Sequence, residues 1–157
     1  KKTGASIIIH PGRDVQAPFD ILDILGEAGA DIKRVVMGHI GRTYPDVDLV
    51  IKLAGSGCYL AYDQFGWENS YFSYGSTDFP SDAMRIGYVK RLVEAGYVNQ
   101  IVIGQDIACK HLLQKYGGYG YAHLLDNVIP RMESGGLTSS EVDTITKLNP
   151  AEILTVI

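Results

Sequence analysis

Short apolar runs alternate along this chain with longer stretches in which apolar residues recur at helical spacing. The runs rich in β-branched residues cover about 5–10, 34–39, 57–62 and 100–104, and an amphipathic or capped stretch follows each. Continuous apolar runs are typical of strands buried on both faces, and their alternation with helices indicates βα units around a parallel sheet. The pattern therefore predicts four βα units.

The predicted helices have recognisable ends. Gly29 and Gly55 stop the first two, and Ser81 is a cap candidate for the third. Thr138, with Glu141 three residues later, is typical of a capped helix start. The helices are expected at about 18–28, 45–54, 81–95 and 123–132, with a last one opening at Thr138.

Four βα units are half of an eight-stranded barrel. An open four-stranded parallel sheet would leave two long unpaired edges, which natural proteins seldom tolerate. The chain is therefore expected to be part of a larger barrel, or to close one by pairing with a second copy. A four-stranded doubly wound domain is the alternative interpretation.

Composition limits the classes of partner. The chain has 157 residues and a net charge of −4, with no cluster of basic residues, which argues against nucleic acid and anionic membrane surfaces. We expect one domain over 1–157, and no apolar stretch approaches the roughly 20 residues of a membrane span. Cys58 and Cys109 are expected to be free thiols, and with no sign of a signal peptide the protein is expected to be cytoplasmic.

Three of the residues that close these apolar runs can bind a metal ion. His10, His39 and Asp106 occupy the same place in their βα units, at the end of a predicted strand. A barrel would gather such residues around one mouth, and two imidazoles with a carboxylate suit zinc, manganese, iron or cobalt. Alternatively, each side chain closes its strand by hydrogen bonding to a loop.

Further candidates for substrate binding lie close to these positions. Arg13 and Arg42 each stand three residues beyond a predicted ligand and are placed to hold an anionic group, although ordinary loop salt bridges are an equal alternative. Tyr62 ends the third predicted strand, and His123 follows a loop rich in glycine and tyrosine whose glycines alternatively serve a tight turn. A long loop after the third strand is expected to form a substrate lid or a subunit contact through Trp67, Tyr71, Phe72 and Tyr74.

Taken together, these motifs closely resemble the phosphotriesterase-related branch of the amidohydrolase superfamily. The resemblance runs from end to end of the chain. It is carried by 7–13 (IIIHPGR), 35–43 (VVMGHIGRT), 57–63 (GCYLAYD), Asp106, 115–123 (KYGGYGYAH) and the closing Asn149-Pro150.

The resemblance implies an α/β fold that is the C-terminal half of a TIM (β/α)8 barrel, with strands five to eight. It implies that His10 and His39 are the metal ligands of strands five and six. Asp106 would be the strand-eight carboxylate that binds metal and accepts a proton from the attacking water. The implied activity is divalent-metal-dependent hydrolysis of a phosphotriester, lactone, ester or amide small molecule, with two ions, most simply zinc, in a complete barrel.

The chain also differs from the family pattern in several respects. The family's first half supplies a His-x-His pair and a bridging carboxylate that we do not find in these residues, so the chain is expected to be incomplete as a catalyst and to need an N-terminal half-barrel or a homodimer partner. Gly41, Ala61 and Gln105 stand where relatives commonly carry Asp, Glu, and His or Asn. Two alternatives stay open: a non-catalytic half-barrel assembly module with remnant ligands, and a mononuclear hydrolase.

Overall fold

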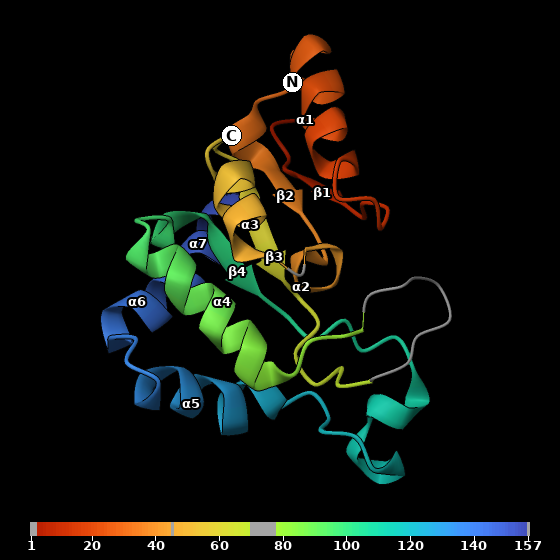
Figure 1. Ribbon diagram of the computed structural model, residues 1–157, viewed down its shortest axis with the longest axis vertical. Helices are drawn as coiled ribbons and strands as arrows, with labels where there is room; N and C mark the ends of the chain where they lie inside the picture. The colour runs from red at the N-terminus through yellow and green to blue at the C-terminus, as the bar shows by residue number, and fades with distance from the viewer. Residues whose placement is uncertain (1–2, 45, 70–77, 157) are drawn as a thin grey trace.

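Four parallel strands form one sheet in sequential order, with helices between them (Figure 1). This computed structural model describes residues 3–44, 46–69 and 78–156. The order β1-β2-β3-β4 has no reversal, whereas a doubly wound sheet requires one. The predicted α/β half-barrel is therefore confirmed and the doubly wound alternative is wrong. The strands are β1 (Ile7–Ile9), β2 (Val35–Met37), β3 (Tyr59–Tyr62) and β4 (Ile101–Ile103).

The strands are shorter than their apolar runs, and β1 departs from the expected burial. Ile8 is 71 % exposed and Ile7 39 %, although the sequence predicted a strand buried on both faces. The expectation is wrong for β1 because it lies at an edge of the sheet and pairs only with β2 among the described residues. Strands β2 and β3 are buried along their whole length.

Helices follow the strands as predicted, with one addition. The short helix α2 comes directly after β2, where the sequence predicted only loop. None of the helices in the described ranges has the length and apolar character needed to cross a bilayer. The helices are α1 (Ala17–Glu27), α2 (Ile40–Thr43), α3 (Val47–Ala54), α4 (Asp82–Glu94), α5 (Ile129–Ser134), α6 (Ser139–Asp143) and α7 (Asn149–Leu154).

The last two predicted helices each contain a wider turn, which begins the first and divides the second. One turn of π-helix, at Leu124–Val128 and again at Thr144–Leu148, precedes α5 and α7. Pro130 and Pro150 stand at the starts of these two helices, and a proline ring clashes with the carbonyl of the preceding turn. We attribute both π turns to this clash. The predicted cap at Thr138 is confirmed, since the capping box with Glu141 is complete.

The main core lies between the sheet and its helices. Val35, Met37, Leu60 and Ile101 point into it from three strands and are fully buried. The opposite face carries a smaller cluster around Val36 and other alternating strand residues. Because all four strands run parallel, their carboxyl ends lie at one end of the sheet, where the predicted ligands lie.

Candidate metal centre

Two predicted ligands, His10 and His39, face each other across the ends of β1 and β2. His39 Nε2 lies 2.9 Å from His10 Nδ1, and the two rings meet edge to face with centroids 4.4 Å apart. Gly38 permits this approach, because a Cβ at that position would lie 2.8 Å from the carbonyl oxygen of Ile9. The structure thus brings two imidazole nitrogens to one point, as the phase of the βα units predicted.

Asp63, at the end of β3, holds the His39 ring. Its Oδ1 accepts hydrogen bonds from the His39 backbone N–H at 3.0 Å and from His39 Nδ1 at 2.9 Å. A carboxylate on one imidazole nitrogen leaves the other nitrogen free to bind a metal, which is a common arrangement around zinc. Asp63 was not predicted as a site residue, although its place directly after a predicted strand was a usable signal.

Arg42 contacts the far side of the His10 ring, opposite the nitrogen that faces His39. One guanidinium nitrogen donates to His10 Nε2 at 2.8 Å. With His39 Nδ1 donating to Asp63, His39 Nε2 accepts from His10 Nδ1, and His10 Nε2 accepts from Arg42. This tautomer assignment satisfies every contact with two neutral imidazoles.

Electrostatics favour the neutral form of His10. Partial desolvation lowers the pKa of His10, although the residue is exposed, and His39 and Arg42 lower it further, while the carboxylates of Asp106 and Asp63 oppose them. A neutral imidazole is the form that binds a metal ion. The pKa of Arg42 is also lowered, first by burial and then by the charge of nearby Arg13.

Asp106 lies beside this pair without joining it. Its Oδ2 is 4.0 Å from His39 Nδ1, on the side of the ring that faces Asp63 rather than the side that faces His10. Across the described residues, no three or more His, Cys, Asp and Glu side chains are grouped so as to hold a metal ion. The predicted trio is therefore brought into one region, with two members in contact and the third adjacent.

His39 and Asp106 also have an unusual backbone conformation. Among the described non-glycine residues, His39 (φ 55°) and Asp106 (φ 45°) have positive φ. The left-handed region costs an L-residue about 1 kcal/mol or more, and such strain gathers at functional sites. Two of the three predicted ligands therefore have a strained backbone.

The other predicted binding residues do not all lie near the two histidines. Arg42 is in the region of the histidines and only 9 % exposed, and Arg13 is near enough to affect its pKa. Tyr62 and His123 are only 1 % and 2 % exposed, so their burial does not favour contact with a substrate. Burial raises the pKa of the Tyr62 phenol far above its ordinary value.

His123 instead belongs to a buried charged network that the sequence did not predict. Its Nε2 lies 2.6 Å from Asp82 Oδ2, and Asp82 Oδ1 accepts from Arg85 at 2.9 Å. Asp82 and Arg85 are each 1 % exposed. The only local signal was the spacing of Asp82 and Arg85, three apart on one helix, while His123 comes from a distant segment.

The aromatic loop after β3 is described only in part. Trp67 is buried, with its ring stacked on Phe79 at 5.6 Å. Tyr71, Phe72 and Tyr74, which were predicted to form a lid or a subunit contact, lie outside the described residues.

Comparison with known proteins decides the family. The model of the phosphotriesterase family matches residues 1–154. The chain belongs to the phosphotriesterase family. The resemblance drawn from the motifs is therefore confirmed, and the sheet of four βα units corresponds to part of the TIM barrel of this hydrolase family.

Phosphotriesterase-family relatives show how much of a longer protein the chain represents. The N-acetyltaurine hydrolase of Dictyostelium discoideum is 44 % identical over all of this chain, which spans 43 % of that protein. The resiniferatoxin-binding protein of Rhodobacter sphaeroides superposes with a TM-score of 0.88 and 28 % identity, over 95 % of this chain and 41 % of its own. The phosphotriesterase homology protein of Escherichia coli, solved with phosphate in its active site, gives 0.85 and 28 %, over 98 % and 49 %. The chain thus spans about half the length of the relatives it matches.

Proposed function

We propose that this chain supplies the C-terminal half of the active site of a divalent-metal-dependent hydrolase. The observation that carries the proposal is the facing pair of nitrogens on His10 and His39, 2.9 Å apart, with the remaining ring nitrogens held by Asp63 and Arg42. Side chains fixed in this way are suited to binding one ion between them.

The donor set fits a zinc-like ion in part. His10 and His39 supply two nitrogens, and Asp106, whose side chain is 37 % exposed, is the third ligand we propose. Catalytic zinc sites use three protein ligands and keep one position open. A second ion would need ligands from outside this chain's described residues, so the two-ion centre applies to a complete barrel.

The contacts of His10 support a substrate role for Arg42. Arg42 donates to His10 Nε2, and its own Nε is buried without a hydrogen-bond partner. When His10 Nδ1 binds an ion, the ring proton belongs on Nε2, and a guanidinium donor is no longer matched there. Arg42 would then turn to an anionic acceptor, with Arg13 as the second cation of the same group.

We propose an amide that carries an anionic group as the substrate class. The Dictyostelium relative is named for hydrolysis of N-acetyltaurine, an acetamide with a sulfonate at its other end, and two arginines suit a sulfonate. The phosphotriester, lactone and ester substrates predicted from the family remain the competing classes. The small-molecule substrate and the need for a second half-barrel or a homodimer partner belong to this proposal too.

In the proposed reaction, the ion would activate the water and the residues of the chain would handle the proton. A bound divalent ion supplies Lewis acidity and makes water a usable nucleophile near neutral pH. Asp106 accepts a proton from the water that adds to the amide carbonyl carbon. The C–N bond then breaks and the leaving amine takes the proton from Asp106, which releases acetic acid and the free amine, and these ionise in water to acetate and the ammonium.

A hydrolysis assay on the zinc-loaded protein, assembled with the N-terminal half-barrel or homodimer partner that completes the site, tests this function. We expect N-acetyltaurine to be cleaved to taurine, and Asp106→Asn to abolish the cleavage. Arg42→Met should raise KM for the sulfonate substrate and leave KM for a neutral ester unchanged. A folded, zinc-loaded assembly that cleaves no amide, ester, lactone or phosphotriester would contradict the proposal and favour a non-catalytic assembly module.

We also place this activity in the cytoplasm. Both cysteines are free thiols, with Cys58 buried and Cys109 exposed, which is the state that a reducing compartment maintains. Labelling of both thiols in freshly lysed cells tests this placement, and a pre-existing modification of Cys109 would argue against it.

A further inference from the structure

We infer that Trp67 is a positioning residue for Asp106: its indole N–H fixes the strained backbone that presents the Asp106 carboxylate beside His39. The inference rests on the proposed metal site. It adds a residue from the loop after β3 to a site otherwise built by the strand ends.

The contact that carries the inference joins Trp67 to the backbone of two residues. Trp67 Nε1 donates to the carbonyl oxygen of Gln105 at 2.9 Å and to that of Asp106 at 3.1 Å. Asp106 has φ 45°, a conformation that L-residues adopt only when their surroundings stabilise it. The shared N–H holds the two carbonyl groups on either side of this strained residue.

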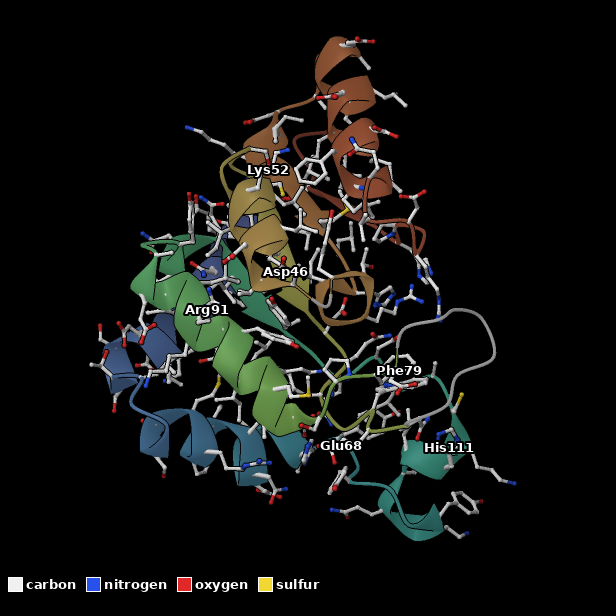
Figure 2. The ribbon with its side chains drawn as sticks, viewed as in Figure 1. Asp46, Lys52, Glu68, Phe79, Arg91 and His111 are labelled. Carbon is white, nitrogen blue, oxygen red and sulfur yellow. The ribbon has the colours of Figure 1, made fainter. Side chains whose placement is uncertain are left out.

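Trp67 is itself held firmly enough to serve this purpose. Its backbone N–H donates to the carbonyl of Gln64 at 3.1 Å, and its carbonyl accepts from buried Arg85 at 2.8 Å. Its ring lies between Phe79, stacked at 5.6 Å, and His111, edge-on at 6.2 Å. Phe79 and His111 gather near Glu68 at the same end of the molecule (Figure 2).

The same loop also reaches the Asp106 side chain. Gln64 Nε2 donates to Asp106 Oδ2 at 3.4 Å, and Gln64 is only 5 % exposed. Backbone and carboxylate of Asp106 are therefore both contacted from the loop after β3.

Two substitutions distinguish the hydrogen-bonding role of the Trp67 indole from its packing role. Trp67→Phe keeps an aromatic ring in the stack but removes the N–H donor together with part of the ring, whereas Phe79→Leu removes the stacked aromatic partner and keeps the donor. Outer contacts of this kind typically change metal affinity by 10- to 100-fold. We expect Trp67→Phe to weaken zinc binding by about tenfold, measured by competition with a chromogenic chelator, and Phe79→Leu to change it by no more than about twofold.

Intrinsic fluorescence supplies a second readout that needs no variant of Trp67. The chain contains one tryptophan, so its emission reports only on this loop. We expect zinc to shift the emission of the full chain with the same midpoint as zinc binding, and we expect no such shift in Asp106→Ala.

The outcomes distinguish the inference from the function on which it rests. If the unmodified protein binds no zinc, both the proposed metal site and this inference are overturned. If it binds zinc while Trp67→Phe binds equally well, only the inference is overturned. Should Trp67→Phe not fold, the emission of the unmodified protein decides, because an emission unchanged at saturating zinc overturns the inference.

Discussion

Replacing Asp63 by asparagine should weaken metal binding without unfolding the protein. Asp63 Oδ1 accepts two hydrogen bonds from His39, at 3.0 and 2.9 Å, and its side chain is 25 % exposed. The Asp63→Asn substitution keeps an acceptor oxygen in a side chain of the same shape. The change therefore removes the charge of the acceptor and little else.

The magnitude follows from the two hydrogen bonds. A hydrogen bond to a charged group contributes about 1.5–3 kcal/mol and a neutral one about 0.5–1.5 kcal/mol, so neutralising the acceptor costs about 1 kcal/mol for each bond. The total of about 2 kcal/mol that orients the His39 ring corresponds to a loss of about 30-fold in metal affinity. This value lies within the 10- to 100-fold range typical of carboxylates that orient a metal-binding histidine.

The assay is zinc competition with a chromogenic chelator, accompanied by thermal unfolding of the metal-free protein. Asp48→Asn is a matched control, because Asp48 is an exposed carboxylate whose pair with Arg91 lies on the surface at 2.9 Å. We expect this control to leave zinc affinity unchanged. A folded Asp63→Asn protein with zinc affinity within twofold of the unmodified protein would refute the orienting role of Asp63.

Two further predictions concern the fold. Asp82→Asn should lower the free energy of unfolding by about 3–5 kcal/mol in urea, because it removes the buried charge that Arg85 and His123 share; a loss below about 1 kcal/mol would contradict the importance of this network. The second prediction concerns Glu141, whose pKa is lowered by hydrogen bonds from the Thr138 backbone N–H and hydroxyl. Its contribution to stability is therefore full above the ordinary glutamate pKa of about 4.3 and is lost as the pH falls through the lower folded value. Tm measured against pH should fall more steeply on acidification in the unmodified protein than in Glu141→Gln, and identical slopes would show that the charge of Glu141 contributes nothing to stability.

Local patterns in the sequence predicted the elements and their order. Apolar runs located all four strands, and Gly29, Ser81 and Thr138 marked helix ends close to where the structure has them. The phase of His10 and His39 within their βα units predicted that they meet. These features depend on periodicity, capping and strand direction, which neighbouring residues determine.

Features that depend on distant contacts were not predictable in this way. Ile8 is exposed because β1 lies at an edge of the sheet, which the residues around Ile8 do not reveal. The contact between Asp82 and His123 joins two segments that are far apart in the sequence. The orientation of His39 depends on a contact with Asp63 in the next unit and on a left-handed backbone, which has no periodic signal. The same limit applies to Asp106, whose carboxylate is adjacent to the pair rather than in it.

Metal content per chain tests the central claim most directly. The protein is loaded with zinc and passed through gel filtration, alongside its His10→Ala/His39→Ala variant, and bound zinc is counted in each. The facing nitrogens predict about one ion retained by the unmodified protein and none by the variant. Equal zinc in both proteins, or none in the unmodified protein, would contradict the claim that these two histidines form a metal site.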